Sequence, residues 1–471
     1  MTERATTGRP HLAVIGAGPA GLAATVAAAA RGVRVTLVDA ATEAGGQFYR
    51  QPAAGLGARR AQALHHHWRT WQRLRNALAG HVEAGRVTHL TDHHVWFVER
   101  GPSGGCTVHA LLGPEQEEPA TVRSDAVLLA TGGYERVLPF PGWTLPGVVT
   151  AGGAQAMLKG TLAVPGRTAV VAGTGPLLLP VATGLAAAGV EVAALVESAG
   201  PAAFLRQARA LAAQPEKVAE GVGFAARLLR HRVRTLVRHT VVEAHGTDRL
   251  AAVTVAALDA DGRIRPGSER RIPCDTLAVG HGMLPHTDLA ETLGCRLDGA
   301  GVHVDDEQRT DVPGVWAAGE TTGIGGSALA LAEGHIAGCS AAARLHGTAP
   351  DPRIWAAAAR SRTRLRAFFA ALDTGYAPPA HWAEQVTDDT VVCRCEEVTA
   401  QAVRVAVREL GAGDLRTVKL LTRAGMGWCQ GRMCGPAVAG LAGCPQTAGR
   451  RPFARPVPLG VLAHAGEPDD D

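Results

Sequence analysis

Aromatic side chains are scarce in this sequence of 471 residues, where Phe, Trp and Tyr together make up 4%, whereas glycine occurs 58 times. Small residues allow helices to pack closely on parallel sheets, so this composition favours a layered α/β protein. The net charge of +4 is too small to indicate a nucleic-acid partner. The first ten residues, MTERATTGRP, lack the apolar stretch of a secretory signal, so we expect a cytoplasmic protein.

Charged residues are absent from the segment 168–190, which is long enough to span a bilayer. Four glycines and two prolines interrupt the segment and divide it into apolar runs separated by a turn. We therefore predict a strand, a glycine turn and a buried helix here, and no membrane span.

The segment 11–39 carries a glycine motif in the setting of a dinucleotide-binding fold. A buried strand is predicted over 12–15, an alanine-rich helix follows the glycines, and a second strand over 33–38 ends on Asp39. The turn, with the spacing G-x-G-x-x-G, contains Gly16, Gly18, Pro19, Ala20 and Gly21. In this motif the glycines permit a tight turn, the approach of a pyrophosphate and close helix packing, and the acid accepts a hydrogen bond from a ribose. The helix N-terminus adds a partial positive charge for the phosphates.

Three further segments indicate that this dinucleotide is FAD. The segment TDVPGVWAAGE resembles the second FAD-contacting motif of flavoproteins with two dinucleotide-binding domains, in which the acid lies near the ribityl chain. An ATG turn follows the apolar run over 126–129, and the paired glycines of GGQFYR indicate backbone that runs close to a ligand. The residues that we expect to contact FAD in these segments are Gly46, Gln47, Thr131, Gly132, Gly319 and Glu320. A helix is predicted after the glycines of 323–326, and the resemblance to these flavoproteins implies that its N-terminus points at the flavin ring and stabilises negative charge there.

A second strand–turn–helix–strand unit begins at residue 168. Gly173 and Gly175 match the first two glycines of the motif, and Glu197 stands where the ribose-binding acid belongs. Leu178 replaces the third glycine, so we expect the helix to stand further from the strand. Glutamate favours NAD over NADP because it repels a 2′-phosphate. Three interpretations stay open: NAD, another adenine nucleotide, or a retained fold without a nucleotide site.

Together with two close pairs of cysteines in the C-terminal region, these units predict an α/β flavoprotein with two Rossmann-like dinucleotide-binding domains, the second inserted in the first, and a small helical iron–sulfur domain. The expected boundaries are 1–160 and 276–346 for the split FAD-binding domain, 161–275 for the second, NAD-like domain, 347–385 for a helical linker, 386–448 for the iron–sulfur domain and 449–471 for a Pro-rich tail. We expect this tail to be extended, and either to cover a neighbouring subunit, to pack on its own chain or to be a loose terminus.

Four of the nine cysteines form two close pairs in the C-terminal region. They are Cys393, Cys395, Cys429 and Cys434. Two short helices are predicted between the pairs, with Thr399 and Asp414 as N-caps. Two pairs of thiolates can hold a [2Fe–2S] cluster or a zinc ion. The predicted flavin favours the cluster, because a flavin can pass electrons singly to it whereas zinc has no redox chemistry. We reject a disulfide reductase, because GGQFYRQP contains no cysteine and the second domain contains no C-x-x-C.

Several longer stretches together resemble one protein family. They are GGQFYRQ, LLATGGYERVLPFPGWTLPGVVTAGGAQAMLK, GTGPLLLPVA, VGHGMLPHTDLAETLGC, GVWAAGETTGIGGSALALAEG, VVCRCEEVT and TRAGMGWCQGRMCGP. They are similar to the A (α) subunit of opine oxidases, the middle subunit of hydrogen cyanide synthase, and the α subunits of dye-linked proline and hydroxyproline dehydrogenases. The cysteine pairs resemble the bacterioferritin-associated-ferredoxin-like [2Fe–2S] domain, although its second pair is usually C-x-x-C and here is C-x₄-C. The resemblance covers nearly the whole chain.

The resemblance implies an FAD-dependent oxidoreductase that transfers electrons for an amino-acid-oxidase-like flavoprotein catalytic subunit. The further candidate partner is a small ferredoxin-like subunit. The sequence indicates no catalytic residue in this chain. Two alternatives remain. One is a self-sufficient NADH-dependent reductase that feeds a ferredoxin or another acceptor, and the other is a non-catalytic scaffold with a structural metal.

Overall fold

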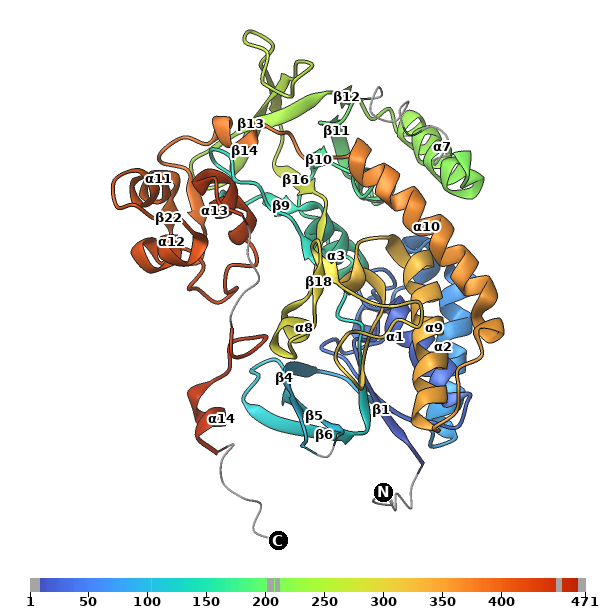
Figure 1. The fold of residues 1–471 in the computed structure, drawn as a ribbon. Helices are drawn as coiled ribbons and strands as arrows, with labels where there is room; N and C mark the ends of the chain where they lie inside the picture. The colour runs from blue at the N-terminus through green and yellow to red at the C-terminus, as the bar shows by residue number, and fades with distance from the viewer. Residues whose placement is uncertain (1–8, 103, 201–206, 208–211, 446–450, 465–471) are drawn as a thin grey trace.

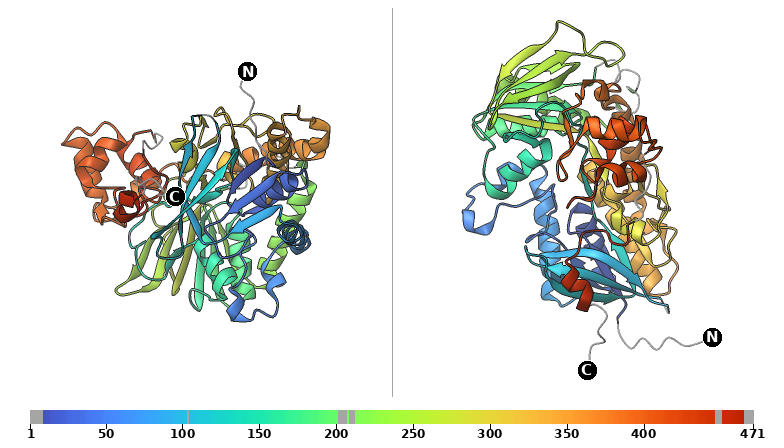
Figure 2. Two further views of the ribbon diagram at one scale, coloured as in Figure 1. Left: turned by 90° about the horizontal axis from the view of Figure 1, so that it is seen from below. Right: turned by 90° about the vertical axis from the view of Figure 1, so that its left-hand side faces the viewer.

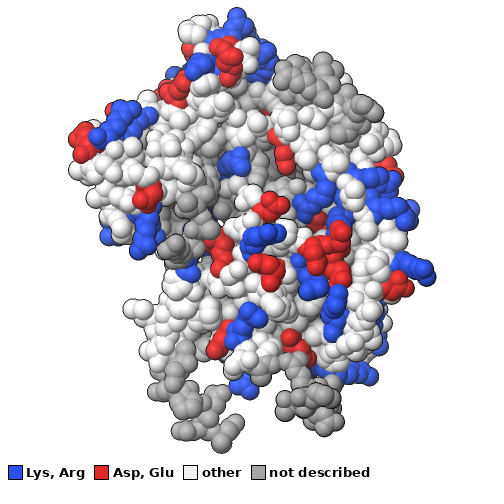
Figure 3. Space-filling model, viewed as in Figure 1, with Lys and Arg blue, Asp and Glu red and all other residues white. Residues whose placement is uncertain are grey.

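The computed structural model describes residues 9–102, 104–200, 207, 212–445 and 451–464. Two sheet-based domains lie one above the other, and a small helical domain stands beside them (Figures 1 and 2). No helix in these ranges combines the length and the apolar character that crossing a membrane requires. Lys and Arg are interspersed with Asp and Glu over the face seen in Figure 3, so this face carries no broad patch of a single charge.

The first domain is built on a five-stranded parallel sheet with the strand order β20-β7-β1-β2-β3. Its central strands β7, β1 and β2 are almost entirely buried because both faces of the sheet are covered, one by helices and the other by a three-stranded antiparallel sheet. The parallel sheet and its helices are β1 (His11–Ile15), α1 (Pro19–Ala29), β2 (Arg34–Val38), α2 (Trp68–Glu83), β3 (Val87–Leu90), β7 (Ala126–Leu129), β20 (Val315–Ala317) and α9 (Gly326–Leu345). The antiparallel sheet is β4 (His93–Arg100), β5 (Cys106–Leu112) and β6 (Glu118–Ser124).

The second domain repeats this plan with the strand order β12-β11-β10-β16-β9. Its parallel sheet and helices are β9 (Val148–Thr150), α3 (Ala151–Thr161), β10 (Thr168–Thr174), α4 (Leu178–Ala187), β11 (Glu191–Glu197), α7 (Pro215–Arg230), β12 (Thr235–Val237) and β16 (Thr276–His281). An antiparallel sheet of β13 (His239–Gly246), β14 (Leu250–Ala257) and β15 (Arg270–Pro273) covers its other face. The segment 168–190, without charges, is thus a central strand and a helix of a buried α/β layer.

The second sheet extends beyond the boundaries expected from the sequence. β9 and β16 pair with each other, and β16 pairs with β10, so all three belong to the second sheet. The boundary expected after residue 160 therefore falls inside α3, and the boundary expected at 276 cuts off a strand. Hydrogen bonding between strands far apart in sequence decides this membership. The chain returns to the first domain through β17 (Met283–Pro285), which pairs with β8 (Gly133–Glu135).

Three short segments follow the return: α8 (Asp288–Thr292), β18 (Leu297–Asp298) and β19 (Gly301–Val302). The long helix α10 (Ala356–Gly375) then packs along α9, with Leu365 and Phe368 buried. It lies inside the range expected as a helical linker.

The small domain has a core of its own, which surrounds its cysteines. Its elements are β21 (Val391–Cys393), β22 (Val398–Thr399), α11 (Ala400–Arg408), α12 (Leu415–Thr422) and α13 (Gly435–Ala442). The side chains of Thr399 and Asp414 accept hydrogen bonds from the N–H groups of Ala402 and Thr417, so both predicted N-caps are present.

The described part of the tail, 451–464, packs on its own chain. The N–H of Ala454 donates to the carbonyl of Trp96 at 2.9 Å, and Val461 of α14 (Leu459–His464) packs against Trp96 and Leu111 of the antiparallel sheet. The described part of the tail is thus packed, and it is not extended throughout, because α14 is helical.

Candidate functional site

The first glycine turn joins β1 to α1, and its glycines are needed for different reasons. Gly16 has a φ of +104°, and a Cβ there would lie 2.3 Å from the carbonyl oxygen of Ala130. A Cβ on Gly21 would lie 1.8 Å from the carbonyl oxygen of Gly16. Gly18, in contrast, has a φ of −72°, and its Cβ would meet no atom nearer than the Cα of Gly46 at 4.0 Å. The protein leaves space above Gly18, as expected where a pyrophosphate approaches the backbone.

Gly46 and the start of α1 border that space. Gly46 has a φ of +57°, and a Cβ on it would lie 2.8 Å from the Cα of Gly18. Pro19 is the first residue of α1, where a missing N–H costs no helical hydrogen bond. Gln47 instead accepts a hydrogen bond from Arg50 at 3.1 Å in an exposed contact. The structure therefore brings the backbone of Gly46 to the glycine turn and directs the Gln47 amide to Arg50.

Asp39, which follows β2, has a buried carboxylate oxygen, Oδ2, without a hydrogen-bond partner. Burial raises the pKa of Asp39 to about 6, although the backbone N–H groups of Ala41, Ala17 and Ala40 oppose this rise. A buried polar atom without a partner costs about 1–3 kcal/mol, and a ribose hydroxyl would supply the missing donor. The unpartnered carboxylate oxygen of Asp39 is thus a suitable acceptor for a ribose hydroxyl of a dinucleotide.

The second predicted motif lies directly on α1. Gly319 has a φ of +80°, and a Cβ on it would lie 2.7 Å from the Cβ of Ala20. Glu320 follows within the short helix η3 (Gly319–Thr322), where burial raises the pKa of its carboxyl group and a hydrogen bond from the N–H of Gly326 lowers it. The carboxyl group of Glu320 is therefore held at the N-terminus of α9.

The ATG turn and the second motif meet at His286, which follows β17. The hydroxyls of Thr131 and Thr321 both donate to the carbonyl of His286, at 2.7 and 2.9 Å. The N–H of His286 donates to the carbonyl of Gly132 at 2.9 Å, and Gly132 itself has a φ of +75°. The first strand of the return segment is thus hydrogen-bonded to both predicted FAD motifs.

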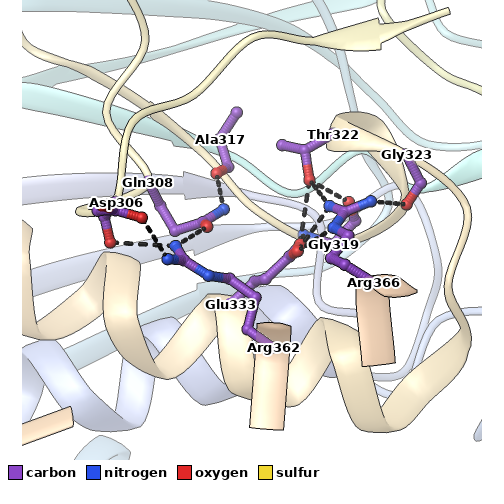
Figure 4. A network of polar contacts seen from close by, with 9 residues as sticks. All are labelled: Asp306, Gln308, Ala317, Gly319, Thr322, Gly323, Glu333, Arg362 and Arg366. Carbon is purple, nitrogen blue, oxygen red and sulfur yellow. Dashed lines mark hydrogen bonds and ion pairs between the residues drawn. The ribbon is translucent and has the colours of Figure 1, made fainter. Parts of the chain in front are cut away.

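A buried ion pair between α9 and α10 supports the second motif (Figure 4). The Glu333 side chain is 1% exposed and lies 2.6 Å from Arg366. Glu333 also accepts hydrogen bonds from the N–H of Gly319 at 2.9 Å and the hydroxyl of Thr322 at 3.0 Å. Burial raises the pKa of Glu333, and the charge of Arg366 is the largest opposing influence. Glu333 is not among the site residues predicted from the sequence, where its only signal is its place as a lone acid in an apolar helix.

One turn earlier in α10, Arg362 makes a second attachment to the same region (Figure 4). It pairs with Asp306 at 2.7 Å and donates to the amide oxygen of Gln308 at 2.9 Å. Gln308 in turn donates to the carbonyl of Ala317, at the end of β20. The helix expected as a linker therefore holds the strand and the turn of the second motif.

Small residues allow α9 to approach α1 closely. A Cβ on Gly334 would lie 2.1 Å from the carbonyl oxygen of Ala20, and one on Gly338 would lie 2.3 Å from that of Ala24. The four-residue spacing of these glycines places them on one face of the helix. This spacing is a signal that the sequence offers for the close contact, although none of the predicted motifs includes it.

The second glycine turn also leaves space at its second glycine, since a Cβ on Gly175 would meet no atom within 4 Å, whereas one on Gly173 would lie 1.7 Å from the carbonyl oxygen of Gly280. Gly173 and Gly175 have φ values of +131° and +121°, so the backbone conformation alone calls for glycine at both positions. Leu178 is 2% exposed and is the first residue of α4, which begins five residues after Gly173, whereas α1 begins three residues after Gly16. The backbone conformation, rather than a ligand, is sufficient to explain both glycines.

Glu197 is already engaged by its own turn. Its two carboxylate oxygens accept hydrogen bonds from the N–H groups of Gly175 at 3.2 Å and Ala199 at 2.8 Å. Burial raises the pKa of Glu197 to about 7. Tyr376 follows α10 and lies near Glu197. Burial and, to a lesser extent, the charge of Glu197 raise the pKa of Tyr376 to about 12. Asp39, with its unpartnered oxygen, is therefore the better acceptor for a ribose than Glu197.

The four clustered cysteines interact with one another through their side chains. The hydrogen bond between Cys434 and Cys429 lowers the pKa of Cys429 and raises that of Cys434. Cys434 also interacts with Cys393, and Cys395 with Cys429. The N–H of Gly425 donates to the sulfur of Cys393 at 3.4 Å. One thiol of the set is thus readily ionised, as a metal ligand requires.

Four interacting thiols can hold either a single tetrahedral ion or a [2Fe–2S] cluster. Tetrahedral zinc needs four donors around one centre. A [2Fe–2S] cluster distributes four thiolates over two irons, two on each.

Comparisons with known proteins divide the chain in the same way. Residues 10–344 match the family model for pyridine nucleotide-disulphide oxidoreductases, and residues 391–442 match the BFD-like [2Fe-2S] binding domain. Hydrogen cyanide synthase subunit HcnB of Pseudomonas protegens is 34% identical over 435 residues, which cover 89% of each chain. The A subunit of opine oxidase from Agrobacterium tumefaciens is 33% identical over 442 residues, 91% of this chain and 84% of its own. In fold, the chain is similar to the crystal structure of L-proline dehydrogenase from P. horikoshii, with a TM-score of 0.64, 18% identity, and coverage of 97% of this chain and 80% of that one.

Proposed function

Since this chain belongs to the pyridine nucleotide-disulphide oxidoreductase family and is an FAD-dependent oxidoreductase with a [2Fe–2S] domain, we propose that it is the electron-transferring subunit of an amine-, amino-acid- or opine-oxidising complex. The observation that carries this proposal is that one chain joins a flavin-type glycine turn to a domain with two pairs of interacting thiols. Relatives that match almost the whole chain are themselves named as subunits, which supports the same interpretation.

In this proposal, FAD lies along the turn between β1 and α1. Asp39 accepts a hydrogen bond from the adenosine ribose with its free Oδ2, and the space above Gly18 admits the pyrophosphate. Gly319 and Glu320 border the ribityl chain, and the N-terminus of α9 stabilises negative charge on the reduced ring. Arg366, by neutralising Glu333, keeps this border in place.

The cysteines Cys393, Cys395, Cys429 and Cys434 are the proposed ligands of the cluster. FAD supplies two-electron chemistry and the cluster supplies one-electron chemistry. With both groups bound, this chain would convert two-electron chemistry at the flavin site into single-electron transfer at the four cysteines.

The proposed partner is an amino-acid-oxidase-like flavoprotein subunit that oxidises the substrate, and the further candidate is a small ferredoxin-like subunit. A product of a neighbouring oxidase-like gene that copurifies with this chain would support the proposal. An isolated chain that oxidised an amino acid unaided would contradict it.

A self-sufficient NADH-dependent reductase is the second candidate. The retained glycine turn at Gly173 and Gly175 and the acid Glu197 favour it. The existing hydrogen bonds of Glu197 and the bulk of Leu178 weigh against it, although each carboxylate oxygen keeps a lone pair for a ribose.

One anaerobic experiment separates these candidates. A visible spectrum with iron and sulfide analysis is recorded before and after NADH is added. Flavin with about two irons per chain is expected, and no bleaching by NADH favours the electron-transferring subunit. Rapid bleaching favours the NADH reductase, and flavin with zinc but no iron contradicts the proposed electron exit.

A further inference from the structure

A single carboxylate, Asp288, connects three segments that are far apart in the sequence. Its Oδ2 lies 3.0 Å from the Nε2 of His286 and 3.0 Å from the Nε of Arg432. Its Oδ1 pairs with Arg451 of the tail. The Asp288 side chain is only 10% exposed, so these contacts are largely shielded from water. Burial alone would raise the pKa of Asp288, but the hydrogen bonds and charges of His286 and Arg432 outweigh it and hold the pKa well below its ordinary value.

Through its contact with His286, the Asp288 carboxylate is connected to the proposed flavin site. His286 is the residue whose carbonyl accepts hydrogen bonds from Thr131 of the ATG turn and from Thr321, which directly follows the second motif. The ring of Tyr134 packs edge-on against the His286 ring, with centroids 6.1 Å apart. The backbone of His286 is therefore held by both predicted FAD segments, and its ring lies between Tyr134 and Asp288.

Through its contact with Arg432, the Asp288 carboxylate is connected to the cysteine loop. Arg432 lies inside the loop from Cys429 to Cys434 and donates to the carbonyl of Cys429 at 3.1 Å. The same guanidinium reaches Asp288 and the carbonyl of Ala454. Its side chain is 17% exposed. The loop that carries two of the proposed cluster ligands is thus attached to the first domain by a buried, charge-assisted contact.

We propose that Asp288 is a positioning residue for electron transfer, which fixes the Cys429–Cys434 loop against the turn that carries both FAD motifs. This inference rests on the proposed function, because it assumes that electrons pass between flavin and cluster within this chain. A buried carboxylate shared by two arginines and a histidine loses its ion pairs with Arg432 and Arg451 when its charge is removed. Arg432 then keeps at most a neutral amide oxygen as its acceptor at position 288, and the loop is held less firmly against the first domain.

The test compares Asp288→Asn with Asp388→Asn. The control removes a carboxylate that pairs with Arg404 within the small domain and, in the described part of the chain, has no link to the flavin motifs. Two measurements are made on the full chain with FAD and iron bound: hydrogen exchange of the loop 429–434, and the rate of cluster reduction after the flavin is photoreduced. Midpoint potentials of both centres are measured in parallel.

For Asp288→Asn we expect normal flavin and iron content, unchanged potentials, faster exchange in the loop and slower transfer, because the rate of electron tunnelling falls as the distance between the two centres grows. Asp388→Asn is expected to match the unsubstituted chain in all of these. If Asp288→Asn does not fold, Arg432→Gln breaks the same contact from the other side.

Three results would overturn the inference. Unchanged loop exchange and transfer rate in Asp288→Asn would show that the carboxylate does not position the loop. A shifted potential with unchanged exchange would show an electrostatic rather than a positioning role. A slowing of equal size in Asp388→Asn would show a non-specific effect. If the cluster of the unsubstituted chain were not reduced by its flavin at all, the proposed function would fail instead.

Discussion

Replacing Gly18 by alanine should separate the folding of the first domain from its binding of FAD. The φ of −72° and the extended ψ at this position suit alanine, and the new Cβ would lie no closer than 4.0 Å to any protein atom. The stability of the FAD-free protein should therefore change by less than about 1 kcal/mol, because the loss of unfolded-chain entropy favours alanine and the loss of an N-cap glycine opposes it.

The same Cβ would occupy the space above the turn that we assign to the pyrophosphate. If the phosphates lose two charge-assisted hydrogen bonds at about 1.5–3 kcal/mol each, the loss is about 3–6 kcal/mol. The dissociation constant for FAD should then rise by ~10²–10⁴-fold. Fluorescence titration of the FAD-free protein measures this, and urea unfolding of the same sample measures its stability.

Gly80→Ala is the matched control, since Gly80 lies on the exposed face of α2 with no atom near its Cβ position. It should stabilise the protein by about 1 kcal/mol and leave FAD binding unchanged. Unaltered FAD affinity in Gly18→Ala would refute the assignment of the pyrophosphate site. A loss of stability of more than about 2 kcal/mol would refute the claim that the turn has internal space for a side chain.

The remaining predictions concern the second motif, the cluster and the ribose-binding acid. Arg366→Met should destabilise the flavin domain by about 3 kcal/mol, because it leaves the charge of Glu333 buried and unpaired; adding Glu333→Gln should restore part of the thermal stability, and no recovery would argue against the ion pair. Cys395→Ser should lose iron and cluster absorbance but keep flavin, whereas Cys444→Ser should keep both; retained iron in the first variant would remove that cysteine from the ligand set. In the FAD-free protein the pKa of Asp39 is raised to about 6, above the unfolded value of about 4, so the stabilisation from its proton is present below about pH 4 and is lost as pH rises to about 6. In thermal unfolding, the stability of Asp39→Asn relative to the unsubstituted protein should therefore rise between about pH 4 and pH 6. A relative stability that does not change with pH would contradict the raised pKa.

The sequence was sufficient to predict the α/β flavoprotein fold with a small iron–sulfur domain, and the family comparisons confirm both. The reason is that motifs such as G-x-G-x-x-G combine local backbone requirements with a fixed order of strand, helix and acid. The caps at Thr399 and Asp414 were predictable for the same reason, because each depends on a side chain and an N–H group three residues away.

Contacts between distant segments could not be predicted in this way. The pairing of β16 with β9 and the ion pair of Arg366 with Glu333 join residues that are 33 or more positions apart. Arg432 and Asp288 are separated by 144 positions, and nothing in either local sequence indicates the other. Local patterns specify elements, whereas the partners of buried charges depend on how those elements pack.

The iron–sulfur domain is attached to the rest of the chain on both sides of its sequence. At its first strand, the indole N–H of Trp143 donates to the carbonyl of Val391 at 2.6 Å. Beyond its last helix, Arg451 pairs with Asp288 and Ala454 is hydrogen-bonded to Trp96. A domain that is joined by a single flexible linker can move between an electron donor and an electron acceptor. A domain that is attached at two places keeps a fixed position. We therefore expect tunnelling over a fixed distance, with an internal transfer rate that does not vary with the viscosity of the solvent.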